Sequence, residues 1–397
     1  MLVEWMGFFL SMFVLLVLSQ KNLGVAMFAG AIILGIFLAP ESLPLKIWES
    51  LINPTTIFLA GVVSLIPIIG GVLNETGQMD RLISNMRVGR KLFLMLSPAL
   101  VGLLPMPGGA LLSAPLIDKA GAGIPHEKKV GINIWFRHIL YLVYPLSADL
   151  IVSTTAAGIE LYQPIPYLSI ILLSSLFLGY FFFLGGKLRK MEYKEKFSLR
   201  ELFPPLAILF IAPLLDLLLG EILVLPTREI ATFIAVLVSL TFAILIGKLS
   251  LTQLRRIVVK AKPWNFAFMM MGIMVFLGVF RGSRVFDLFI NTPITSSMLF
   301  GIAFLLGFVT GRIVTPAGIV FPIYIMKFGQ ISLPVFALIY FGIFLGYIIT
   351  PVHPCVSLTL ASFKVDLKNY LKIMIRPVCI SVFMSLLVLH LVTSMSL

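Results

Sequence analysis

Long apolar stretches recur along the whole chain of 397 residues, and each approaches the length of about 20 residues that a bilayer-spanning helix needs. Only 12% of the residues are charged, roughly half the fraction found in soluble domains. A soluble protein is therefore excluded, and an all-α polytopic membrane protein is predicted. We expect ten spanning helices, at residues 5–19, 23–39, 54–74, 130–158, 163–186, 202–219, 229–247, 264–281, 332–361 and 373–394.

Two further apolar regions, about 91–120 and about 294–327, do not fit a simple crossing. Each divides into two arms that are shorter than a spanning helix, and the arms flank a tip rich in proline and glycine. The first tip contains Pro107-Gly108-Gly109, and the second contains Pro316-Ala317-Gly318. These patterns predict two re-entrant hairpins, each of which enters and leaves the membrane on the same side.

The two hairpins belong to a predicted internal repeat. Matching motifs follow one another at a nearly constant offset of 206 to 209 residues, as in the pair Pro54 and Pro263 and the pair Pro145 and Pro351. Each repeat would have five crossings, and an odd number gives the two repeats opposite orientations in the membrane. The predicted units are a first inverted repeat at 1–186, a basic cytoplasmic linker at 187–201 and a second inverted repeat at 202–397.

The formal net charge of +13 has two interpretations, a nucleic-acid partner or the excess of Lys and Arg in cytoplasmic loops. With ten helices and two re-entrant hairpins, 23 Lys and Arg residues fall on one side of the membrane and 5 on the other. If both hairpins crossed, the division would be 16 to 12. The uneven division favours re-entrant hairpins, with both termini extracytoplasmic. The lipid bilayer is thus the expected partner, and no nucleic acid is expected.

Helix breakers follow each hairpin, in the predicted helices 130–158 and 332–361. Broken helices in matching positions of inverted repeats are typical of transporter sites, because half-helix N-termini attract anions and unwound carbonyls bind cations. The alternative is that these prolines are structural kinks. The predicted substrate-binding residues are Gly108, Gly109, Ser147, Arg312, Thr315, Ala317, Gly318 and Thr350.

A few polar residues inside the apolar segments are candidates for ion coupling. Asp149 is predicted to carry the coupling ion, although it could instead cap a half-helix. His353 is either a proton carrier or a neutral hydrogen-bonded side chain, and Arg312 either binds a carboxylate or pairs with a buried acid. Structural pairing or snorkelling is expected of Arg137, His138, Asp118 and Asp216. The predicted coupling residues are Asp149, His353, Ser153, Thr154 and Ser357, whose hydroxyls could instead bond to helix carbonyls.

This architecture resembles the ion transporter superfamily, which includes divalent anion/sodium symporters, gluconate permeases and some sodium/proton antiporters. The segment from Pro105 to Pro115 (PMPGGALLSAP) and the ten-helix length are more closely similar to a prokaryotic family, domain of unknown function 401. The resemblance covers essentially the whole chain. It implies a homodimer in a prokaryotic cell membrane, with a mobile transport domain of hairpins and broken helices. The symporters carry Ser-Asn-Thr at their hairpin tips, whereas neither tip here contains asparagine, so sodium coupling and dicarboxylate specificity do not follow from the resemblance.

The predicted function is a secondary active transporter that moves a small organic anion with H⁺ or Na⁺ by alternating access. The alternatives are a cation/proton antiporter without an organic substrate and a lipid-handling membrane protein. The chain contains no nucleotide-binding loop, no His-Glu-x-x-His motif and no Cys-x-x-Cys pair. We therefore expect no enzymatic activity, no metal and no cofactor besides the coupling ion.

Overall fold

The computed structural model contains only helical secondary structure in the part of the chain that it describes, residues 2–103, 109–186, 188, 193, 197–289 and 292–394. The first half of the chain forms α1 (Leu2–Ser19), α2 (Leu23–Leu38), α3 (Leu43–Ile52), α4 (Pro54–Glu75), α5 (Gln78–Ser84), α6 (Arg90–Gly102), α7 (Gly109–Ala120), α8 (His126–His138), the 3₁₀-helix η1 (Ile139–Leu142), α9 (Ala148–Ala157) and α10 (Ile165–Phe183). The second half forms α11 (Leu199–Ile222), α12 (Glu229–Gly247), α13 (Leu251–Ala261), α14 (Pro263–Arg281), α15 (Val285–Phe289), α16 (Ser296–Thr310), α17 (Val314–Phe328), α18 (Leu333–Ile349), α19 (Pro354–Phe363) and α20 (Leu367–Ser394).

Seven of the described helices are long and apolar enough to cross a bilayer, namely α1, α4, α10, α11, α12, α14 and α20. The pair α18 and α19, bent by 41° at the break between them, makes an eighth span when counted as one. The other two predicted crossings form α2, which has 16 residues, and the broken segment of α8, η1 and α9. Large apolar side chains on the outer helices, such as Phe177 and Phe383 at 67% exposure each, suit a lipid environment. The chain is a multi-pass membrane protein.

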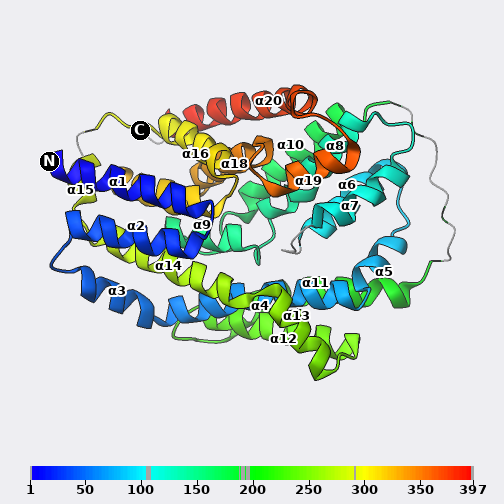
Figure 1. Cartoon of the computed structure of the whole chain (residues 1–397), viewed down its shortest axis with the longest axis horizontal. Coiled ribbons are helices and arrows are strands. Elements are labelled where there is room, and N and C mark those ends of the chain that lie inside the picture. The colour runs from blue at the N-terminus through cyan, green and yellow to red at the C-terminus, as the bar shows by residue number, and fades with distance from the viewer. Residues whose placement is uncertain are drawn as a thin grey trace.

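The helices form two layers. The first layer consists of α1–α5 and α11–α15, and its main contacts between the two halves of the chain are α2 with α14, α4 with α12 and α4 with α14. The second layer consists of α6–α10 and α16–α20, and its main contacts are α6 with α8, α16 with α18 and α9 with α17. In Figure 1, α4, α11, α12 and α13 lie along one long side of the molecule, and α8, α10, α18 and α20 lie along the other.

The two halves of the chain repeat the same order of elements, from α1–α10 to α11–α20. In this order α2 corresponds to α12, α4 to α14, α7 to α17 and α9 to α19. The contacts are reciprocal: the contact of α2 with α14 is matched by that of α12 with α4, and the contact of α9 with α17 is matched by that of α19 with α7. Likewise α5 contacts α11, and α15 contacts α1. The matching elements α5 and α15 lie at opposite ends of the molecule (Figure 1).

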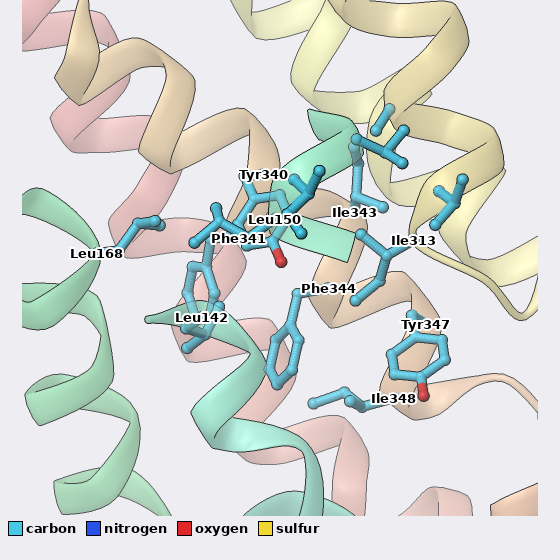
Figure 2. Close-up of a cluster of buried hydrophobic side chains, with 14 of the residues drawn as sticks. Leu142, Leu150, Leu168, Ile313, Tyr340, Phe341, Ile343, Phe344, Tyr347 and Ile348 are labelled. Atoms are coloured by element: carbon cyan, nitrogen blue, oxygen red, sulfur yellow. The ribbon is translucent and has the colours of Figure 1, made fainter. Parts of the chain in front are cut away.

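Helix α18 forms the centre of the second layer, since every residue from Val335 to Ile349 is buried. Figure 2 shows its aromatic and aliphatic side chains packed around Leu142 of η1, Leu150 of α9 and Ile313. A helix that is apolar on all sides must be covered either by other helices or by lipid, and here other helices cover it. Glycines allow the closest approach, because a Cβ atom at Gly346 would overlap the carbonyl oxygen of Phe304 in α16.

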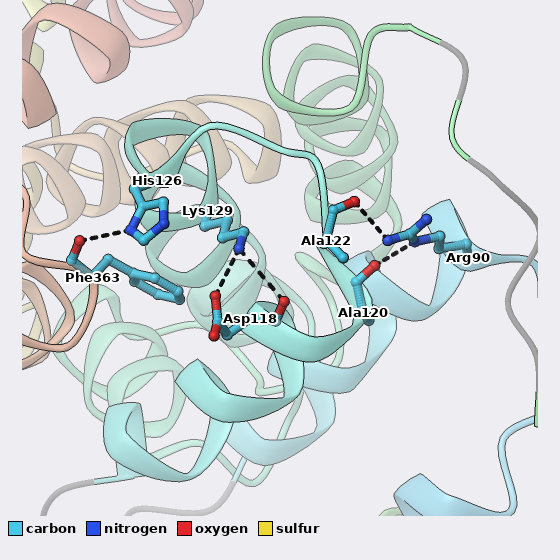
Figure 3. Close-up of polar contacts among 7 residues, drawn as sticks. All are labelled: Arg90, Asp118, Ala120, Ala122, His126, Lys129 and Phe363. Atoms are coloured by element: carbon cyan, nitrogen blue, oxygen red, sulfur yellow. Dashed lines mark hydrogen bonds and ion pairs between the residues drawn. The ribbon is translucent and has the colours of Figure 1, made fainter. Parts of the chain in front are cut away.

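Each predicted hairpin consists of two packed helices, α6 with α7 and α16 with α17. At the open end of the first hairpin, the Arg90 guanidinium donates hydrogen bonds to the carbonyls of Ala120 and Ala122 (Figure 3). The tip of the second hairpin is shorter than predicted, because α17 already begins at Val314. Pro316 does not prevent this, since proline is tolerated in the first turn of a helix.

Four short helices, α3, α5, α13 and α15, were not among the predicted elements. Neither α3 nor α13 is long enough to cross a membrane, and both carry apolar and charged residues. In α13 only Ile257 is buried, and Ser250 and Gln253 form a capping box at its start. Short amphipathic helices of this kind are typical of the membrane interface.

Candidate functional site

A cavity of about 390 Å³ lies between the two layers, within the range of small-molecule sites. The first layer lines it with Gln20, in the turn after α1, and with the apolar residues Leu23, Val63, Ile66, Pro67, Phe266 and Met269. The second layer contributes both helix breaks and the second hairpin tip, with the residues Leu103, Tyr141, Leu146–Asp149, Thr310–Val314, Tyr347 and Val352–Pro354. The predicted breaks and the second tip therefore meet at one cavity.

Asp149 lies at the start of α9, directly after the first break. The neighbouring Ser147 caps this helix, because its side chain accepts a hydrogen bond of 3.1 Å from the amide of Leu150. The cap is thus made by the serine, and the Asp149 carboxylate has no hydrogen bond or ion pair to any described residue. An acid in this position is available to bind a cation or a proton from the cavity.

Arg312 lies at the second hairpin tip and lines the same cavity. Its backbone is fixed by Thr310, whose hydroxyl accepts a 3.3 Å hydrogen bond from the Arg312 amide. Among the described residues the guanidinium has no hydrogen-bonding or ion-pair partner, although it interacts electrostatically with Asp149. The predicted alternative, an ion pair with a buried acid, is therefore not formed, and a planar five-donor group is free to bind an anion.

His353 is the N-cap residue of α19, at the second break, and it also lines the cavity. Its Nε2 atom lies 3.2 Å from Nε2 of His138, at the end of α8. The ring of Tyr347 packs against it at a centroid distance of 4.3 Å. The role of His353 as a proton carrier stays a prediction.

Of the other predicted coupling residues, Ser153 and Thr154 each donate a hydrogen bond to the carbonyl four residues earlier, at 2.6 Å and 2.9 Å. Ser357 donates to the carbonyl of Pro351 at 3.5 Å. These bonds match the alternative interpretation, in which hydroxyls in membrane helices bond to the helix backbone. None of the three hydroxyl residues lines the cavity.

None of the other predicted substrate-binding residues that the structure describes lines the cavity. Ala317 was expected to offer a free amide, but its N–H donates to the carbonyl of Ile313 within the helix at 3.1 Å. Gly318 lies one residue farther into α17, so its amide also belongs to the helical pattern. Thr350 is buried and accepts a hydrogen bond from the amide two residues later. The buried hydroxyl of Thr315 has no partner among the described residues.

In the first hairpin, Gly108 lies outside the described residues, and Gly109 begins α7. The carbonyl of Gly109 accepts a 2.8 Å hydrogen bond from Nη1 of Arg137. The same Nη1 lies 3.3 Å from the hydroxyl of Ser113, which donates to Asn133 at 2.7 Å. Arg137 is thus fixed by neutral groups, and within the described chain no acid pairs with it. This network joins α7 to α8, and its partners were not predicted from the sequence.

The structural roles expected of two acids are confirmed. Asp216 is fully buried and accepts hydrogen bonds from Arg228 and Thr232 at 2.9 Å each and from Tyr162 at 2.6 Å. Asp118 pairs with Lys129 at 2.7 Å, near the open end of the first hairpin (Figure 3). Neither acid lines the cavity, so Asp149 is the only acid of the described chain that does.

The fold is similar to that of a solved transporter. The structure titled "Crystal structure of the Alcanivorax borkumensis YdaH transporter reveals an unusual topology" aligns with a TM-score of 0.62 over 90% of this chain and 88% of that chain, at 13% sequence identity. No curated protein matches the sequence. The chain therefore has the fold of a transporter-like membrane protein. The family model "Protein of unknown function (DUF401)" matches residues 4–392, and the chain belongs to this family.

Proposed function

We propose that the protein is a secondary active transporter that moves a small organic anion, coupled to H⁺ or Na⁺, by alternating access. The observation that carries the proposal is the cavity between the layers, into which Asp149 and Arg312 project without forming an ion pair. Opposite charges inside a membrane protein are costly unless they are compensated. Two such groups at one cavity are therefore suited to binding ions of both signs.

Arg312 is the proposed anion-binding residue. Its guanidinium can bind a carboxylate through two parallel hydrogen bonds. The opposite wall contains apolar side chains, including Phe266 and Met269. A cavity with one cationic group and an apolar wall favours an organic anion with an apolar portion over a small inorganic anion.

Asp149 is the proposed coupling residue. Without a bound anion, the charge of Arg312 would partly compensate that of Asp149, with which it interacts electrostatically. When an anion takes up the charge of Arg312, Asp149 is left uncompensated in surroundings where charges interact strongly. Binding of H⁺ or Na⁺ to Asp149 restores neutrality, so the anion and the cation should favour each other's binding. This reciprocal preference is the basis of symport.

The proposed movement is a displacement of the second layer against the first. The reciprocal contacts between the halves, and the positions of α5 and α15 at opposite ends of the molecule, support the inverted repeat predicted from the sequence (Figure 1). In such a repeat, α6–α7 and α16–α17 would be re-entrant hairpins that open to opposite sides. We also propose that the protein forms a homodimer in a prokaryotic cell membrane, with both termini on the extracytoplasmic side.

The first experiment is a thermal-unfolding screen of the purified protein with aliphatic and aromatic carboxylates at several pH values and Na⁺ concentrations. A bound ligand raises the stability of the folded state. Loss of one charge-assisted contact costs about 1.5–3 kcal/mol, so Arg312→Gln should weaken binding roughly 10- to 100-fold. Arg255→Gln, which removes an exposed arginine of α13, is the matched control. Equal affinity of the two variants would contradict the role of Arg312.

The second experiment measures uptake of a ligand from that screen into proteoliposomes with imposed pH or Na⁺ gradients. Asp149→Asn should abolish uptake driven by the gradient, whereas Asp80→Asn, which alters an exposed acid of α5, should preserve it. Unchanged coupling in Asp149→Asn would refute the role of Asp149. An internal pH that responds to Na⁺ alone, without an organic anion, would favour the cation/proton antiporter.

A further inference from the structure

Three side chains with metal-binding atoms meet where α8 approaches the second helix break. They are His138, the last residue of α8, and His353 and Cys355, which flank Pro354 at the start of α19. Their ligand atoms, one from each residue, all lie within 4.8 Å of one another. Both histidines are buried, and Cys355 is half-buried. Asp149 does not belong to the cluster, whereas His353 lines the same cavity as Asp149 and Arg312 and interacts electrostatically with Arg312.

The hydrogen bonding of His138 determines which of its nitrogens carries a lone pair. Nδ1 lies 2.8 Å from the carbonyl oxygen of Ile134, and a carbonyl can only accept, so Nδ1 carries the hydrogen. In the neutral ring, Nε2 then has a lone pair, and this atom faces Nε2 of His353 at 3.2 Å. A backbone carbonyl that fixes the tautomer and orientation of an imidazole is the usual outer partner of a metal-bound histidine.

The distances suit one small ion. Two nitrogens at 2.0–2.1 Å from a tetrahedral metal are about 3.3–3.4 Å apart, close to the observed 3.2 Å between the two Nε2 atoms. A nitrogen and a thiolate sulfur on the same ion are separated by about 3.5–3.6 Å, whereas the ligand atoms here lie within 4.8 Å of one another, so each nitrogen–sulfur distance needs to shorten by up to about 1.3 Å. A rotation of the Cys355 side chain, with no change in the helices, can provide such a movement.

The charge around the cluster narrows the choice of ion. Arg137 lies next to the Cys355 thiol, where its positive charge can balance the thiolate form that binds a metal. No acid belongs to the cluster, so a hard cation such as Mg²⁺ or Ca²⁺ lacks the oxygen ligands that it requires. One thiolate and two imidazoles favour a thiophilic ion, Zn²⁺ or Cu⁺.

We propose that His138, His353 and Cys355 bind one thiophilic metal ion, Zn²⁺ or Cu⁺, at the edge of the cavity. The metal would join α8 of the first repeat to α19 of the second repeat. It would thereby stabilise the present arrangement of the second helix break. The absence of a metal motif from the sequence is explained by the distance of 215 residues between the two histidines.

The test uses the full-length purified protein after chelation of metals. Co²⁺, a spectroscopic substitute for Zn²⁺, should bind with one-to-one stoichiometry and produce a sulfur-to-metal charge-transfer absorption band. A competition titration with a Cu⁺-specific chelator tests the second ion. Either ion should raise the unfolding temperature, because it binds only the assembled site.

Cys355→Ser and His353→Gln should abolish the charge-transfer band or weaken metal binding at least 10-fold. Cys379→Ser and His390→Gln, which alter an exposed cysteine and an exposed histidine of α20, should leave both properties unchanged. Chromatographic behaviour and the unfolding temperature without metal establish that each variant is folded. Failure of both ions to bind, or binding that persists in Cys355→Ser and His353→Gln, would overturn the proposal and leave a hydrogen-bonded imidazole pair. Because no transport is measured, the result is independent of the proposed function.

Discussion

Removal of the buried carboxylate of Asp216 should cost far more stability than removal of the exposed carboxylate of Asp118. Both acids pair with a basic side chain, at 2.9 Å and 2.7 Å, but their exposures are 0% and 60%. Asp216 also accepts hydrogen bonds from Thr232 and Tyr162, so it joins α11, the start of α12 and the loop before α10. Because the ion-pair distances are similar, a difference in stability loss between Asp216→Ala and Asp118→Ala reports the burial and the additional hydrogen bonds of Asp216.

The expected magnitude follows from the groups that each substitution leaves without a partner. Breaking a buried ion pair on one side costs about 3–5 kcal/mol, whereas an exposed pair contributes about 0–1 kcal/mol. Arg228 is 37% exposed and can be hydrated, and Tyr162 can still donate to the carbonyl of Pro213. The loss for Asp216→Ala should thus lie near the lower limit, at about 3 kcal/mol. Asp118→Ala leaves the Lys129 ammonium, whose side chain is only 7% exposed, with the backbone carbonyl of residue 118 at 3.5 Å as its remaining partner. Its loss should therefore lie at the upper end of the range for an exposed pair, at about 1 kcal/mol.

Equilibrium unfolding in mixed detergent micelles, with helical circular dichroism as the signal, measures both losses under the same conditions. Asp216→Asn should fall between wild type and Asp216→Ala, because the amide oxygen can still accept hydrogen bonds but carries no charge. Equal losses for the two alanine variants would refute the argument that burial determines the cost. A loss below 1 kcal/mol for Asp216→Ala would do the same.

Three further predictions concern packing, backbone conformation and pH. Gly346→Ala should lower stability by about 1–3 kcal/mol, because its Cβ would overlap the backbone of α16. Gly301→Ala should not lower stability, because the space around Gly301 is open. Thermal unfolding of the two variants tests this difference. Gly311→Ala and Gly158→Ala both place alanine at a φ near +60°. Only the Cβ of Gly311→Ala would lie 3.1 Å from the backbone of the second helix break, so ligand affinity should fall in Gly311→Ala and not in Gly158→Ala. Lys129 lowers the pKa of Asp118. The stabilisation by this pair is therefore present at neutral pH and is lost as the pH falls through that pKa. The difference in unfolding temperature between wild type and Asp118→Asn should disappear in acid.

The helix breaks were predictable because their signals are local. Pro145 and the pair Pro351 and Pro354 interrupt helical hydrogen bonding wherever they occur in an apolar run. The observed breaks separate η1 from α9 and α18 from α19, at the predicted positions. The predicted second hairpin tip was longer than the observed one. The prediction assumed that proline excludes a helix there, but in the first turn of a helix proline is tolerated because no hydrogen bond is lost.

The partners of Arg137 and His138 were not predictable from the sequence. Arg137 is fixed by a glycine carbonyl and a serine hydroxyl, and neither residue type in an apolar run indicates a bound guanidinium. His138 meets a histidine 215 residues away. Such contacts depend on how the two halves of the chain pack against each other. The spacing of residues within one helix contains no information about them.

The distribution of polar groups around the cavity bears on the proposed transport mechanism. All the charged lining residues belong to the second layer, and the first layer contributes mostly apolar side chains such as Val63, Phe266 and Met269. Apolar contacts are non-directional, so they can be exchanged for similar ones during a sliding movement without breaking hydrogen bonds. Asp149 and Arg312 would move together with the bound anion and cation, and their mutual geometry would be preserved. A layered arrangement with all charges on one side can therefore carry a neutralised ion pair across a barrier that a single charge would not cross.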